Sequence, residues 1–78
     1  MKNDTAEKLS QIFRFILQLP DDADTSNIRR INEVRWDSLA NVTLITALES
    51  EFGVTLDTHE VERLSSYQST LLLLSEKL

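Results

Sequence analysis

The chain has 78 residues and a formal net charge of −5. It contains no cysteine, which excludes disulfides and thiolate metal sites. It has only one glycine and one proline, so helices joined by polar loops are favoured over a β-rich domain, which needs more turn residues. We expect a single domain over residues 1–78, with a small core.

The negative charge is concentrated in one part of the chain. Residues 1–36 and 63–78 carry net charges of zero and +1, whereas residues 37–62 contain six acidic residues and no Lys or Arg. The electrostatic field of such an acidic segment attracts basic partners and repels nucleic-acid phosphates, so we expect no nucleic acid among the partners. On charge alone, an acidic surface that merely keeps the protein soluble is the more frequent explanation.

The first 36 residues predict one helix followed by a long connection. Asp4 and Glu7 have the spacing of a capping box, and apolar residues then recur at helical spacing up to Leu17. This helix of about four turns should end before Pro20, where turn residues begin. In the connection, the apolar residues recur every three positions and either form a short helical turn or hold the loop against the core; they are Ile28, Ile31 and Val34.

No targeting or membrane segment is visible in the sequence. The first residues lack the apolar run of a signal peptide, and no segment approaches the roughly 20 apolar residues that span a bilayer. We therefore expect a cytoplasmic protein.

The stretch from Trp36 to Gly53 predicts the central helix. Asp37 and Ser38 are N-cap residue types, and Gly53 suits the left-handed position that ends a helix. Apolar residues recur at steps of three and four, with the first of them expected to anchor the helix to the core: Leu39, Val42, Ile45, Leu48 and Phe52. The Ser38 hydroxyl should point outward beside free backbone N–H groups.

Two further helices are predicted after Gly53. Asp57 and Glu60 form a capping-box pattern before a short helix of about two turns. Ser65 or Ser66 caps a last helix, and Ser65 and Gln68 have the spacing of a capping box. In this helix, Leu71, Leu74 and Leu78 can face the core, and at least one of four consecutive leucines must be exposed. The fold class is therefore all-α: a small four-helix bundle with three longer helices, one short helix and a long first loop.

The sequence offers no set of residues for catalysis. A serine hydrolase needs an activated serine, a base and an oxyanion hole, but the glycine-flanked serine turn is absent and the single histidine, His59, lies on the short helix. There is no phosphate-binding glycine loop and no histidine and acid cluster for a metal. We assign no catalytic residue and no metal ligand.

The central stretch resembles the acyl carrier proteins. The residues that carry the resemblance are Asp37-Ser38-Leu39, Val42, Leu44-Ile45, Ala47-Leu48-Glu49 and Glu51-Phe52-Gly53-Val54. In that family, the serine of Asp-Ser-Leu carries a 4′-phosphopantetheine arm, which comes from coenzyme A and holds acyl groups as thioesters. The resemblance implies Ser38 as the attachment site, flanked by Asp37 and Leu39. It is weak before Ile31, and Arg35 stands where the most familiar members have glycine.

The resemblance implies a carrier that presents acyl intermediates to enzymes of fatty acid, polyketide or related biosynthesis. Its partners would be a phosphopantetheinyl transferase and acyl-loading and acyl-processing enzymes with basic docking surfaces, and we expect a monomer. Candidate partner-binding residues are Trp36, Glu49, Glu51, Glu60 and Glu62. Trp36 either closes the core or stays partly exposed beside the arm, and core closure is favoured. Two alternatives stay open: a peptidyl or aminoacyl carrier with the same arm, and an unmodified helical interaction module.

Overall fold

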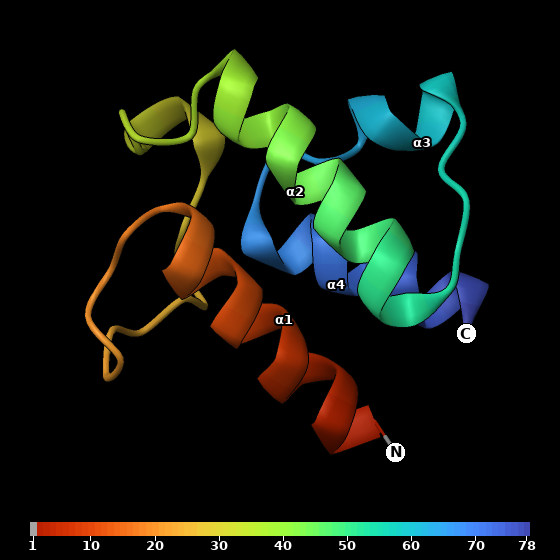
Figure 1. The fold of residues 1–78 in the computed structure, drawn as a ribbon, viewed down its shortest axis with the longest axis horizontal. Helices are drawn as coiled ribbons and strands as arrows, with labels where there is room; N and C mark the ends of the chain where they lie inside the picture. The colour runs from red at the N-terminus through yellow and green to blue at the C-terminus, as the bar shows by residue number, and fades with distance from the viewer. Residues whose placement is uncertain (1) are drawn as a thin grey trace.

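The computed structural model describes residues 2–78, and this part of the chain is all-helical, as predicted (Figure 1). Its only β-type pairing is an isolated antiparallel bridge between Arg29 and Ser66. The elements, in chain order, are α1 (Lys2–Ile16), the 3₁₀ helix η1 (Arg30–Asn32), α2 (Ser38–Phe52), α3 (Thr58–Glu62) and α4 (Tyr67–Lys77). Three helices are long and one is short, which also confirms the prediction.

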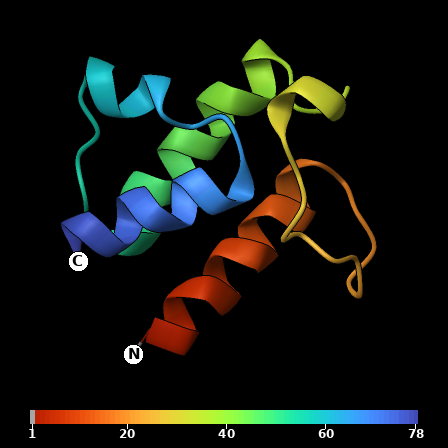
Figure 2. The same cartoon turned by 180° about the vertical axis from the view of Figure 1, so that it is seen from behind.

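Helix α1 packs against both α2 and α4, and the short α3 lies at the opposite end of the molecule from the loop after α1 (Figures 1 and 2). One hydrophobic core runs between the helices. Its buried members come from every α-helix or the segments beside it, and they are Leu9, Phe13, Leu17, Trp36, Leu44, Leu48, Leu56, Leu64, Tyr67, Leu73 and Leu74.

Three aromatic rings form the centre of this core. Phe13 of α1 contacts Trp36 edge-to-face, with ring centroids 5.2 Å apart, and it contacts Tyr67 of α4 in the same manner at 5.4 Å. Edge-to-face pairs stabilise a core beyond the area that they bury. The three rings come from α1, from the segment before α2, and from α4. They therefore connect parts of the chain that are distant in the sequence.

A buried polar chain reinforces the same junction. The Tyr67 hydroxyl donates to the carbonyl of Ala6 at 3.0 Å and lies 3.0 Å from the Ser10 hydroxyl. The Ser10 hydroxyl in turn lies 2.9 Å from that of Thr25, a buried residue of the long connection. Buried hydroxyls are stabilising only when they are paired, and here each one is.

The long connection is held at its middle by backbone hydrogen bonds to the start of α4. The Arg30 N–H donates to the Ser65 carbonyl at 2.8 Å, and the Tyr67 N–H donates to the Ile28 carbonyl at 2.9 Å. Ile28 packs against the core, but Ile31 and Val34 are 88% and 93% exposed. The expectation that these apolar residues hold the loop against the core is therefore correct only for Ile28, and the short helical turn forms as η1.

The structure corrects one predicted helix start and decides another that the sequence left open. Helix α1 begins at Lys2, so Asp4 lies within the first turn and is not the N-cap. The cap of α4 is Ser66, whose hydroxyl accepts the N–H of Ser69 at 2.9 Å. Gln68, the expected capping partner, instead donates to the carbonyl of Ser26 at 3.2 Å. Neighbouring serines have equal capping ability, so the sequence pattern alone did not select the right one.

The last helix presents its leucines differently from the prediction. Leu73 and Leu74 are fully buried and Leu71 is half-buried, whereas Leu72 is 58% exposed. This confirms that one of the four consecutive leucines faces solvent. Leu78 is also exposed, so its expected place in the core is wrong.

We predict that Gly53→Ala destabilises the fold by about 1 kcal/mol, because an alanine is disfavoured in the left-handed conformation. Gly53 ends α2 with φ 65° and ψ 34°, and no atom lies where a Cβ would be added, so backbone strain is the only effect. Urea unfolding measures the difference. Gly53→Asn is the control, since asparagine tolerates this conformation and should lose less. Equal stability of the alanine variant and wild type would contradict the assignment.

Candidate functional site

The first feature of the site is the buried indole of Trp36, directly before α2. The side chain is 3% exposed and packs on Phe13, and its Nε1–H donates to Oδ1 of Asn41 at 2.9 Å. Core closure, the favoured alternative, is thus confirmed. A buried indole offers no contact surface to another protein, so we leave Trp36 out of the partner-facing residues. Its role is to fix the chain just before the helix begins.

Asp37 is the N-cap of α2. Its backbone is extended, with φ −93° and ψ −172°, and its Oδ1 accepts the N–H of Ala40 at 2.9 Å. Its carbonyl accepts the first intrahelical bond, from the Asn41 N–H at 2.9 Å. Of the two cap residue types in the sequence, the structure thus uses the aspartate, and Ser38 becomes the first residue of the helix.

Ser38 is exposed, and its hydroxyl makes no hydrogen bond within residues 2–78. The N–H groups of Ser38 and Leu39 belong to the first turn, where a helix has no backbone acceptors for them. Unpaired N–H groups and the positive end of the helix dipole favour an anionic group at this position. The local geometry therefore fits a phosphodiester on the Ser38 oxygen.

No side chain hydrogen-bonds the Ser38 hydroxyl within residues 2–78, so no base is in place to activate it. His59 lies on α3 and is exposed, and the described residues include no cluster of histidine and acidic side chains that could hold a metal. A hydroxyl without a base is a poor nucleophile by itself. The arrangement instead offers a hydroxyl that a separate enzyme can reach.

Leu39, the third residue of the Asp-Ser-Leu sequence, does not anchor α2. It is 76% exposed, and Val42 is 60% exposed, so the expected apolar face was wrong at its first two positions. Leu44 and Leu48 are the buried residues of α2. Apolar residues occupy two adjacent sides of this helix, and the core covers the side that carries Leu44 and Leu48. Leu39 and Val42 are left on the surface beside Ser38.

Comparison with known proteins shows to which family the chain belongs. The chain is 36% identical over 77 residues to an acyl carrier protein of Petrotoga mobilis, a match that covers 99% of this chain and 91% of that protein. It is 32% identical over 76 residues to acyl carrier protein 5, chloroplastic, of Arabidopsis thaliana, and 30% identical over 75 residues to acyl carrier protein 4, chloroplastic, of Cuphea lanceolata. The chain belongs to the acyl carrier protein family.

The extent of these matches differs between the relatives. This acyl carrier protein family member spans nearly all of the bacterial relative, but 55% and 54% of the length of the two chloroplast proteins. The matches to the two chloroplast proteins each cover 96% or more of this chain. No family model matches it. Over residues 2–78, no helix has the length and apolar character needed to cross a membrane.

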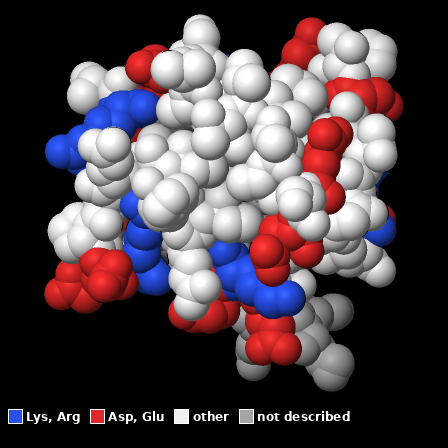
Figure 3. Space-filling view, in the orientation of Figure 1, with Lys and Arg blue, Asp and Glu red and all other residues white. Residues whose placement is uncertain are grey.

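Acidic side chains lie over α3 and the second half of α2, at the right of Figure 3, and further acidic patches lie at the left and along the lower edge of the same view. Two of them lie on α2. Glu49 accepts the Leu56 N–H at 2.8 Å, so its carboxylate holds the segment after the helix. Glu51 is exposed and makes a long ion pair with Lys8, at 3.7 Å. The carboxylate of Glu51 is therefore more accessible to a partner than that of Glu49.

The other two acids lie on α3. Glu60 completes the predicted capping box with Asp57 and binds Lys77 of α4 at 2.8 Å. The Lys77 ammonium, followed by the Asp57 N–H, holds the pKa of the Glu60 carboxyl below its usual range. Glu62 is exposed and forms no ion pair within the described residues. Glu62 is thus the acid of α3 that is most available to a partner.

We predict that Asp37→Ala lowers the free energy of unfolding by about 1 kcal/mol, because the Ala40 N–H loses its cap. Ser38→Ala is the matched control: its hydroxyl has no partner, so its stability should stay close to wild type. Asp37→Asn should retain most of the stability, since an amide oxygen also caps. Urea denaturation of the three variants measures this. A larger loss for Ser38→Ala than for Asp37→Ala would reverse the assignment of the cap.

Proposed function

We propose that this chain is an acyl carrier protein with 4′-phosphopantetheine attached to Ser38. The observation that carries the proposal is the position of Ser38: an exposed, unpaired hydroxyl at the first residue of α2, within Asp-Ser-Leu, in a chain of this family. A transferase can reach this hydroxyl without unfolding any element.

In the attachment reaction, the Ser38 oxygen attacks the phosphorus of coenzyme A that bears the pantetheine chain. The new bond joins the Ser38 oxygen to that phosphorus, and the bond from phosphorus to the bridging pyrophosphate oxygen breaks. Adenosine 3′,5′-bisphosphate leaves, and a base of the transferase takes the hydroxyl proton, because the site supplies none. The unpaired N–H groups of Ser38 and Leu39 would stabilise the negative charge of the phosphodiester.

When bound, the arm supplies the thiol that holds an acyl group as a thioester. The chain contains no cysteine, so it has no sulfur nucleophile of its own for this purpose. Its own contribution is to hold the attachment residue at a fixed, exposed helix start. Tethering raises the effective concentration of the cargo at each partner enzyme. We propose no catalytic role for the chain itself.

The alternatives differ in what supports them. A peptidyl or aminoacyl carrier would use the same arm, but the relatives are named acyl carrier proteins, which favours acyl cargo. An unmodified interaction module would never gain mass from coenzyme A. The monomeric state, the single domain over residues 1–78 and the cytoplasmic location stay predictions, and the chloroplast relatives make other compartments relevant.

We propose that enzymes with basic docking surfaces bind the side of the molecule formed by α2 and α3. The local charge of −6 over residues 37–62 supports this surface. Glu51 and Glu62 are its accessible acids, whereas Glu49 and Glu60 first hold the fold together. Fatty acid, polyketide and related biosynthesis are the pathways in which such partners act.

Incubation with coenzyme A and a broad-specificity phosphopantetheinyl transferase tests the attachment site. Wild type should gain the mass of one phosphopantetheinyl group, and Ser38→Ala should gain none while staying folded. Ser50→Ala, which removes another exposed hydroxyl from α2, is the control and should react like wild type. Intact mass gives the readout. Modification of Ser38→Ala, or no modification of wild type, would disprove the proposal.

A charge-reversal experiment tests the docking surface. The double variant Glu51→Lys/Glu62→Lys should be modified more slowly by a transferase with a basic docking surface, and the defect should shrink as salt screens the charges. The control is Asp21→Lys/Asp22→Lys, which changes the net charge equally in the exposed loop after α1, far from α3 (Figures 1 and 2). Equal slowing by both double variants would mean that only net charge matters, which would contradict a specific surface.

A further inference from the structure

The long connection before α2 presents three arginines without partners. Arg29, Arg30 and Arg35 are exposed, and their side chains form no hydrogen bond or ion pair within the described residues. Every other Lys or Arg of residues 4–78 has a partner inside the chain; these are Lys8, Arg14, Arg63 and Lys77. The function derived so far uses none of the three unpaired cations.

The backbone that carries two of these arginines is held firmly. Arg29 pairs with Ser66 in the isolated antiparallel bridge, and the Arg30 N–H donates to the Ser65 carbonyl at 2.8 Å. The guanidinium groups therefore project from a fixed segment although they have no partner themselves. A partner that binds them does not have to order the backbone, which lowers the cost of binding.

Exposed apolar side chains lie among the arginines. Ile31 lines a hollow of about 400 Å³ together with Arg29 and Arg30, at the junction between η1 and the start of α4. Ile31 is 88% exposed, and Val34 is 93% exposed. Protein interfaces typically combine apolar contacts with arginine. We call this region the arginine surface, and its members are Arg29, Arg30, Ile31, Val34 and Arg35.

The arginine surface lies beside the attachment residue. In both views of the ribbon, η1 is next to the first turn of α2 (Figures 1 and 2). Val34 and Arg35 precede Ser38 by four and three residues, so even a fully extended chain would place them no more than about 14 Å and 11 Å from it. A typical interface covers about 800 Å² of each partner, the area of a disc with a radius of about 16 Å. An enzyme centred on the Ser38 hydroxyl therefore covers Val34 and Arg35.

We propose that the phosphopantetheinyl transferase that modifies Ser38 binds the arginine surface with carboxylate side chains grouped around an apolar contact. The inference rests on the proposed function, since it requires modification of Ser38. The transferase is the partner that must reach the Ser38 oxygen itself. Enzymes that act later meet the cargo at the far end of the arm, so their contacts need not lie so close to Ser38.

The charge distribution favours the carboxylates of a folded protein over an extended polyanion. Residues 29–35 carry a net charge of +2, whereas residues 37–62 carry −6. A nucleic acid or an anionic membrane would present negative charge to both regions at once, and the second would repel it. A folded enzyme can place acidic side chains over the first region and basic ones over the second.

The two charged regions also define an orientation for the partner. Lys and Arg side chains lie over η1 at the upper left of Figure 3, beside a smaller acidic patch, and the acids of α3 lie at the right. Figures 1 and 2 agree that η1 and α3 lie on opposite sides of the start of α2 and its middle, with α2 between them. A partner with acids at one end and bases at the other binds in one direction, because the reversed complex brings like charges together.

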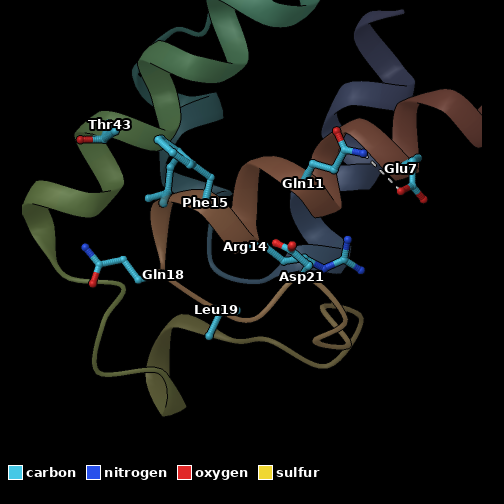
Figure 4. Close-up of a pocket in the computed structure, with 9 residues that line it drawn as sticks. Glu7, Gln11, Arg14, Phe15, Gln18, Leu19, Asp21 and Thr43 are labelled. Carbon is cyan, nitrogen blue, oxygen red and sulfur yellow. Dashed lines mark hydrogen bonds between the residues drawn. The ribbon is translucent and has the colours of Figure 1, made fainter.

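The largest hollow of the described structure lies elsewhere. It has a volume of about 780 Å³ and is lined by Phe15 of α1 and Thr43 of α2, among others (Figure 4). Ser38 does not line it, and Thr43, five positions further along, lies about 140° around the helix from Ser38. Phe15 is 83% exposed there. An enzyme centred on Ser38 has no need to contact Phe15, which makes this residue a control for the apolar part of the proposal.

The charge contact is tested with the full apo chain, coenzyme A and the phosphopantetheinyl transferase from the protein's own source. Arg30→Gln/Arg35→Gln should lower kcat/KM about fivefold at low salt, and the loss should shrink as salt rises. The control Gln11→Glu/Ser75→Glu changes the net charge equally at exposed positions of α1 and α4, and should react like wild type. Wild-type rates for the arginine variant, or equal slowing of both variants, would overturn the proposal.

The apolar contact is tested with a second matched pair. Val34→Ser should raise the KM for the chain about threefold, with little dependence on salt, because the lost contact is not electrostatic. Phe15→Ser, which removes an equally exposed apolar side chain from α1, should leave the KM unchanged. Urea unfolding checks that both variants stay folded. Loss in both variants, or in neither, would overturn the apolar contact.

The outcomes separate this proposal from the function on which it rests. If a broad-specificity transferase never modifies wild type, the attachment at Ser38 fails and the proposed contact fails with it. If Ser38 is modified but the arginine variant reacts like wild type with the protein's own transferase, only the contact is overturned. A defect of the arginine variant that persists unchanged at high salt would also overturn it, since the contact would not be between charges.

Discussion

The indole of Trp36 fixes the point at which α2 begins, and the arrangement of the site depends on that point. Because the ring is buried against Phe13, the backbone leaves the core at Trp36 and must reach the surface within one residue. Asp37 makes this turn in an extended conformation and caps the helix through Ala40. The next residue, Ser38, is then necessarily the first of the helix, with its hydroxyl exposed. The buried ring of Trp36 and the cap of Asp37 thus hold the Ser38 hydroxyl in a fixed place.

The same helix has to serve the core and the surface at once. Leu44 and Leu48 bind it to the core, and this choice leaves Leu39 and Val42 in solvent beside Ser38. For a protein that only had to fold, adjacent exposed apolar side chains would bring no advantage. In the proposed carrier, they would offer apolar contacts to the tethered group or to a partner enzyme.

Much of the fold was predictable because several local signals agreed. The cap residues, the helical apolar spacing and Gly53 all indicated the same limits for α2. The capping box of Asp57 and Glu60 formed at the start of α3 as expected. The sequence left the choice open where two signals were equivalent, as between Ser65 and Ser66 at the start of α4. The exposed state of Ser38 also followed from its place in the sequence, although which of two neighbouring residues caps the helix did not. The roles of Glu49 and Glu60 depend on contacts with Leu56 and Lys77, which lie outside the helix of each glutamate, and the helical pattern of the sequence does not reveal such contacts.

The most direct test of the account is the intact mass of the protein isolated from its natural source, followed by fragmentation of the modified species. A carrier with its arm on Ser38 should show the chain mass plus one phosphopantetheinyl group, with or without a retained acyl group. The fragments should place the added mass on the peptide that contains Ser38. A population entirely at the unmodified mass, or an added group on a different serine, would contradict the account.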